Sequence, residues 1–204
     1  MKLFAFALTL ALFAPALYAE DKLQLSPPPT WKDGWKQVSE QPGRGFRVMV
    51  FVPTADAAQV NAAKESVTVM EASGGPQENR VATLYQAWSQ TAQKTCSGMF
   101  VGRLSPRGEG EFTIAYAQFY CPKRNGLEEG GVDAAKIMAS PTSAFMVVVG
   151  KRTAPFRSEA GGRISYATSE ETQAMAEWQQ NTNEYLTRGV RACRGPVLEM
   201  KCSQ

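Results

Sequence analysis

Four cysteines constrain the fold of this 204-residue chain more than any other feature of its sequence. An even number of cysteines behind an apolar N-terminal leader indicates two disulfides formed in an oxidising compartment. Three connectivities are possible, and local geometry favours Cys96 with Cys121 and Cys193 with Cys202. The chain has no histidine and no closely spaced cysteine pair, so it does not resemble a zinc protein, and we expect no metal and no cofactor.

The preferred pairing follows from a predicted hairpin. Residues 98–104 and 111–120 have the pattern of two strands, and the Ser-Pro-Arg-Gly-Glu-Gly segment between them is typical of a turn. The centre of this hairpin lies near residue 108, with Cys96 12 residues before it and Cys121 13 residues after it. We therefore expect these two cysteines to meet at the open end of the hairpin.

The N-terminus has the three parts of a secretory signal: Lys2, an apolar run over residues 3–17, and small residues near Ala19. The run is shorter than the ~20 residues that cross a bilayer. Cleavage is expected after Ala19, with a cut after Ala16 as the alternative. The sequence thus predicts a signal peptide over 1–19, a periplasmic or secreted mature protein, and no membrane span.

The mature chain is predicted to contain an extended arm over 20–45 and a single domain over 46–204. The arm carries a run of three prolines, which favours polyproline structure, and Trp31 and Trp35 flank a turn within it. These tryptophans either pack on the domain or bind a partner, and both interpretations remain open.

Four segments of the domain have strand character in addition to the hairpin. They are residues 46–52, 66–72, 132–138 and 144–149. The last is an unbroken apolar run, which predicts a central strand buried on both faces.

Two helices are expected, each with one apolar face. The face of the first comprises Val81, Leu84, Tyr85, Trp88 and Ala92. The second begins with a capping-box pattern at Thr168 and Glu171. Its stripe comprises Met175, Trp178, Thr182, Tyr185, Leu186, Gly189 and Val190, which predicts a helix that reaches residue 190.

The predicted order is β-β-α-β-β-β-β-α, and hairpin connections favour an antiparallel sheet. We expect an α+β fold with a mostly antiparallel sheet of about five to six strands and two main helices packed on it. This order, and segment 132–156 with its AFMVVVGKRTAPF run, resembles the PsbP-like fold over about residues 46–192. It is also similar to small periplasmic proteins of Gram-negative bacteria. PsbP-like proteins serve mainly as accessory and binding factors, so the resemblance implies a binding role.

Several catalytic classes are excluded by composition. Without histidine, Ser-His-Asp and Cys-His catalysis cannot operate, and paired cysteines leave no thiolate. No Ser-x-x-Lys or Gly-x-Ser-x-Gly motif occurs. The carboxylate pairs at Glu109 and Glu111 and at Glu128 and Glu129 are typical of exposed turns. We expect a protein that is not an enzyme.

Basic residues concentrate near the end of the domain. Between residues 136 and 163 the only acid is Glu159. The basic residues there are Lys136, Lys151, Arg152, Arg157 and Arg163. If they share a surface, it would suit an acidic protein, lipid or polysaccharide. The net charge of +3 is too small to indicate a nucleic-acid partner.

The sequence as a whole favours a non-enzymatic protein-binding module. Two versions are an immunity protein that neutralises a toxin and an accessory subunit of an envelope complex. Its surface would be a sheet edge, the basic residues, or Trp31 and Trp35. The alternative is a small-ligand carrier with a pocket between sheet and helices. That pocket would be lined by Phe100, Tyr116, Phe119 and Phe145.

Overall fold

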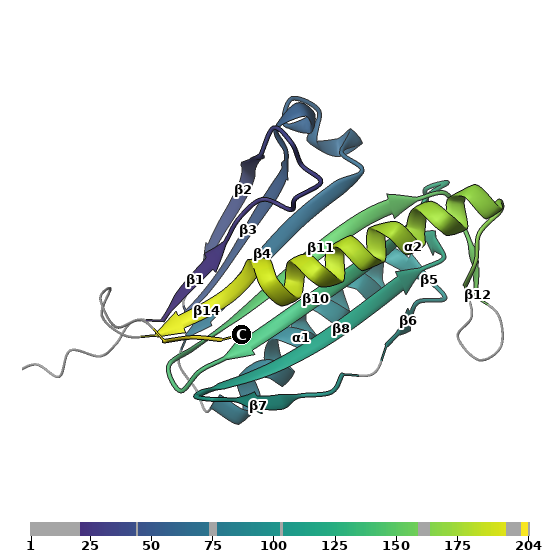
Figure 1. Cartoon of the computed structure of the whole chain (residues 1–204). Coiled ribbons are helices and arrows are strands. Elements are labelled where there is room, and N and C mark those ends of the chain that lie inside the picture. The colour runs from purple at the N-terminus through teal and green to yellow at the C-terminus, as the bar shows by residue number, and fades with distance from the viewer. Residues whose placement is uncertain are drawn as a thin grey trace, which may run out of the picture.

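A seven-strand antiparallel sheet with one helix on each face forms the body of the protein (Figure 1). The structure is a computed structural model, and it describes residues 21–43, 45–73, 77–102, 104–158, 164–194 and 201–203. The predicted signal peptide, Arg44 and Arg163 lie outside the described residues. The α+β class is confirmed, with a sheet wider than the one expected.

The main sheet follows the order β2-β3-β4-β11-β10-β8-β6, and the short β7 also pairs with β8. Its strands are β2 (Trp35–Gly43), β3 (Phe46–Pro53), β4 (Glu65–Ser73), β6 (Phe100–Val101), β7 (Arg107–Glu109), β8 (Phe112–Cys121), β10 (Gly130–Ala139) and β11 (Ser143–Thr153). Strand β11 lies between β4 and β10, as its unbroken apolar run predicted. The predicted hairpin is present, but its turn lies at Gly110 and Glu111 and not near residue 108, because residues 107–109 form β7 and pair with the start of β8. Strand β6 pairs with β8 farther along the same edge.

Three smaller sheets complete the fold. The first has the order β1 (Lys22–Leu25), β14 (Val190–Arg194) and β15 (Lys201–Cys202). The two others are pairs: β5 (Cys96–Ser97) with β9 (Lys123–Arg124), and β12 (Arg157–Ser158) with β13 (Ile164–Ser165). Short 3-10 turns at Thr54–Asp56 and Val60–Ala62 connect β3 to β4.

Successive side chains of the central strands point to opposite faces of the sheet, and each face forms its own hydrophobic core. Val147 and Val149 of β11 pack under α2 (Ser169–Glu184), while Met146 and Val148 pack under α1 (Gln77–Thr95). In Figure 1, α2 crosses the near face of the sheet and α1 lies behind it. The predicted apolar face of α1 is confirmed, with Leu84 fully buried. Neither helix has the length and apolar character needed to cross a bilayer, within the part of the chain described.

The second helix begins as predicted but ends earlier. Thr168 and Glu171 form both hydrogen bonds of the capping box. After Glu184 the chain makes a π-helical turn, Tyr185–Gly189, and Val190 then begins β14. Gly189 permits this close turn, because a Cβ there would lie 2.8 Å from the Tyr185 ring. The prediction of a helix reaching residue 190 was wrong, since Val190 and Ala192 are buried as alternating residues of a strand.

Segment 20–45 is more regular than expected. It contributes β1 to the small sheet and β2 to the edge of the main sheet. Trp35 stacks on Phe51 of β3 with ring centroids 4.6 Å apart, and Trp31 packs edge-on against Trp35. Aromatic packing of this kind fixes the segment on the body of the protein.

Both disulfides have the predicted connectivity. Cys96 is bonded to Cys121 and Cys193 to Cys202. The first joins β5, which directly follows α1, to the end of β8, and the second joins β14 to β15. A disulfide-bonded fold of this kind is consistent with an oxidising, extracytoplasmic compartment.

Candidate functional site

An open groove of about 870 Å³ runs between β1 and the neighbouring ends of β3, β4 and β11. We call it the β1 groove. One wall is β1 itself, which pairs with β14 on one side and with no strand on the other, among the strands of the described residues. An edge strand beside a groove presents main-chain donors and acceptors to whatever occupies the groove. The β1 groove is therefore bordered by an edge strand.

The floor of the β1 groove carries an ion pair that bridges two strands. Arg47 of β3 lies opposite Glu71 of β4 in the antiparallel register. The Arg47 Nε donates to Glu71 Oε2 at 2.8 Å, and Glu40 of β2 lies 3.7 Å from another Arg47 nitrogen. The hydrogen bond to Glu71, together with its charge, raises the pKa of Arg47. The Arg47 side chain is 45% exposed and lines the groove, so a molecule in the groove can reach it.

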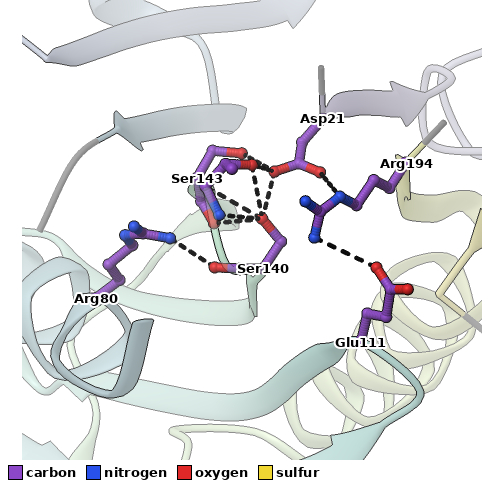
Figure 2. Close-up of polar contacts among 7 residues, drawn as sticks. Asp21, Arg80, Glu111, Ser140, Ser143 and Arg194 are labelled. Carbon is purple, nitrogen blue, oxygen red and sulfur yellow. Dashed lines mark hydrogen bonds and ion pairs between the residues drawn. The ribbon is translucent and has the colours of Figure 1, made fainter. Parts of the chain in front are cut away.

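A buried carboxylate anchors β1 at the other end of this groove (Figure 2). The Asp21 side chain is fully buried, and its Oδ2 accepts hydrogen bonds from the hydroxyls of Ser140, Thr142 and Ser143 in the turn between β10 and β11. The Ser143 bond is 2.6 Å long. Three donors on one carboxylate oxygen hold the start of β1 against this turn.

Two arginines extend the network to other elements. Arg194 of β14 lies 3.8 Å from Asp21 Oδ1 and donates to Glu111 at 3.3 Å. Arg80 of α1 donates to the Ser140 carbonyl oxygen from the opposite face of the sheet. Figure 2 shows these side chains converging on the turn from separate elements. The wall of the β1 groove is thus preorganised by contacts that no local sequence pattern indicated.

The two tryptophans proposed as binding residues belong to the packed interior. Trp31 is only 7% exposed, and its Nε1 donates to Glu65 Oε2 at 2.8 Å. The other carboxylate oxygen of Glu65 accepts from Lys151 at 3.0 Å. Trp35 is partly buried against Phe51. The structure therefore places Trp31 in the core and packs Trp35 against it, in line with the packing interpretation.

Lys136 does not lie on a basic surface, because its side chain is completely buried on the α2 face of the sheet. Its Nζ donates to the Val190 carbonyl oxygen at 2.9 Å and is 3.5 Å from that of Thr187. Burial lowers the pKa of Lys136 to about 8, and the nearby charge of Glu109 opposes this shift. Lys136 thus stabilises the end of the π-helical turn through hydrogen bonds to its carbonyl groups.

The other predicted basic residues are spread over the molecule. Lys151 points to the α2 face, where its Nζ lies 5.8 Å from the Trp178 ring centre. Arg152, the next residue, borders a hollow on the α1 face and donates to the Asn61 carbonyl oxygen. Arg157 is exposed on β12. These described residues do not form a single basic patch, because adjacent residues of a strand, such as Lys151 and Arg152, point to opposite faces of the sheet.

The aromatic residues proposed to line a carrier pocket are also separated by the sheet. Tyr116 and Phe145 belong to the core under α2, whereas Phe119 packs against Trp88 under α1. The Phe100 side chain lies outside the described part of the chain. These residues do not line one pocket.

A second hollow, of about 310 Å³, lies between the end of α1 and the sheet. We call it the Asp133 pocket, after the carboxyl group on its floor. Burial raises the pKa of Asp133 to about 6, although a hydrogen bond with Trp88 and the charge of Arg124 oppose this shift. No pattern in the sequence indicated this site, because Asp133 is a single acid within a strand and only the fold brings it close to Arg124 and Arg152.

Within the described residues, no group of three or more cysteine or carboxylate side chains could hold a metal ion. No protein-family model matches the chain, and no curated protein is significantly similar to it. The resemblance to the PsbP-like fold stays an interpretation of the topology.

Proposed function

We propose that this protein is a non-enzymatic binding module of the periplasm or cell exterior, and that the β1 groove takes an extended segment of a protein partner. The observation that carries the proposal is the position of β1 as an edge strand, among the strands of the described residues, beside a groove of about 870 Å³. An extended segment can add to such an edge through main-chain hydrogen bonds, while side-chain contacts supply specificity.

The groove also defines the chemistry of the partner segment. Lys22 at the start of β1 is exposed, and Arg47, which lines the groove, is partly exposed. Leu23 and Phe145 add apolar surface between them. We therefore expect an extended segment with an acidic side chain near Arg47 and an apolar side chain over Leu23.

Rigidity of the wall supports this assignment. The Asp21 network and the pairing of β1 with β14 hold the strand before a partner arrives. A preorganised surface loses little conformational entropy on binding. An immunity protein that occludes a toxin and an accessory subunit of an envelope complex would both use such a surface.

The experiment begins with site-specific capture of the partner. A photo-crosslinking amino acid replaces Lys22 in one variant and Ala176, on the exposed side of α2, in a matched control. Irradiation with envelope extract and culture supernatant of the source cell should give a defined adduct at position 22 and none at 176. A secreted toxin would support the immunity version, and a resident envelope protein the accessory version.

Affinity for the captured protein then tests the chemistry. Arg47→Glu should raise the Kd at least about tenfold, the effect of losing one charge-assisted contact. Arg188→Glu should leave the Kd unchanged, since Arg188 pairs with Glu184 on α2 away from the groove. Equal adducts at both crosslinking positions, or equal Kd values for both arginine variants, would refute the groove as the binding surface.

A further inference from the structure

The Asp133 pocket lies on the opposite face of the sheet from the β1 groove, so it can be considered independently of the protein partner. Two glycines on its floor create the space. A Cβ on Gly150 would lie 2.8 Å from Asp133 Oδ1, and Gly131 faces the same hollow. Because these positions carry no side chain, the sheet is uncovered beyond Trp88. The volume of about 310 Å³ is within the range of small-molecule sites.

The walls of the pocket are partly apolar and firmly held. Trp88 and Phe119 pack with ring centroids 3.6 Å apart at one side. The Cys96–Cys121 disulfide forms another part of the lining and fixes β5, which directly follows α1, to the end of β8. The shape of the pocket is thus set by covalent and aromatic contacts.

A carboxyl group and two guanidinium groups are placed at different depths. Asp133 lies on the floor, in a hydrogen bond with Trp88. Arg124 and Arg152 also line the pocket, and both approach the same acid, Glu129, at 3.8 and 4.0 Å. These distances are too long for hydrogen bonds, and one Glu129 oxygen is buried without a hydrogen-bond partner among the described residues. Two guanidiniums therefore retain donors that a ligand can use.

From this arrangement we propose that the Asp133 pocket binds a small hydroxylated carboxylate of the sugar-acid class. The carboxylate of the ligand pairs with Arg124 and Arg152 and replaces the long ion-pair contacts that both arginines make with Glu129. A hydroxyl of the ligand hydrogen-bonds to Asp133 on the floor, and its ring packs against the apolar wall. Bidentate pairing with arginine supplies most of the specificity for the anion.

The test compares D-galacturonate with D-galactose, which has the same ring and no carboxylate. Calorimetric titration of the oxidised protein should show binding of galacturonate and at least about tenfold weaker binding of galactose. Galacturonate should also raise the melting temperature, because it binds only the folded state. Failure of galacturonate to bind, or equal binding of galacturonate and galactose, would overturn the proposal.

Two substitutions with opposite expected effects locate the site. Arg124→Gln should weaken galacturonate binding about tenfold through loss of a charge-assisted contact. Glu129→Gln should strengthen it, since the competing carboxylate is removed. Arg157→Gln, at an exposed position on β12, is the matched control and should bind as the wild type does. If Arg124→Gln and Arg157→Gln bind equally, the ligand does not occupy this pocket.

Discussion

Substitution of Asp133 by asparagine should make the protein more stable at neutral pH and leave its stability unchanged in acid. Burial raises the pKa of this carboxyl from 3.8 to about 6 in the folded protein. The folded state therefore holds the proton more tightly than the unfolded state does. Between pH ~4 and ~6 the wild type loses stability as the pH rises, and the loss persists at higher pH.

The magnitude follows from the same values. Each tenfold change in proton affinity corresponds to about 1.4 kcal/mol, so a pKa raised from 3.8 to about 6 gives a penalty of at most roughly 3 kcal/mol. An asparagine oxygen still accepts from Trp88 but carries no charge to desolvate. Asp133→Asn should thus exceed the wild type in unfolding free energy by up to about 3 kcal/mol at pH 7.5 and match it near pH 4.

Urea unfolding followed by tryptophan fluorescence, repeated from pH 4 to 7.5 with the disulfides intact, measures this difference. Asp33→Asn is the control, because it makes the same substitution in an exposed turn. Identical pH profiles for Asp133→Asn and the wild type would show that the carboxylate is not destabilised in the pocket, and the electrostatic reasoning would be wrong.

Three further substitutions test other parts of the structure. Asp21→Ala removes three hydroxyl contacts to a buried carboxylate and should lower the unfolding free energy by roughly 3 kcal/mol or more in urea titrations. Joint replacement of Cys96 and Cys121 by serine opens a loop with a sequence separation of 25 and should cost about 3.5 kcal/mol, seen as a lower melting temperature under non-reducing conditions, in which the Cys193–Cys202 disulfide stays intact. Because burial lowers the pKa of Lys136 from 10.5 to about 8, wild-type stability should rise between pH 8 and 10, and Lys136→Met should lose that rise. A wild-type profile that is flat over this interval would contradict the burial of a charged lysine.

Local patterns in the sequence predicted much of the fold. The predicted hairpin led to the correct first disulfide, although its turn lies at Gly110 and Glu111 and Cys96 pairs in register with Arg124. The capping box at Thr168 marked the start of α2. The apolar run at 144–149 identified the centre of the sheet. Each of these features depends on residues close together in the chain, where spacing and residue type decide the structure.

Features that depend on distant contacts could not be predicted in this way. Val190 continues the apolar stripe of α2, yet Val190 begins a strand because β1 is available as a partner. The sequence predicted Lys136 to be a surface cation, but it is buried, since its ammonium group donates hydrogen bonds to carbonyl oxygens at the end of the π-helical turn. Asp21 anchors the start of β1 through hydrogen bonds from hydroxyls about 120 residues later in the chain, which no local pattern could indicate. Charge along the sequence indicated a basic patch, whereas strand alternation divides Lys151 from Arg152.

Amide hydrogen exchange of the oxidised protein, with and without the partner captured at position 22, tests the central proposal most directly. If a partner segment adds to β1, amides of residues 22–25 that face the groove should exchange more slowly in the complex, while those on the exposed side of α2 keep their rates. Protection confined to surfaces away from β1, with unchanged exchange at residues 22–25, would contradict the account.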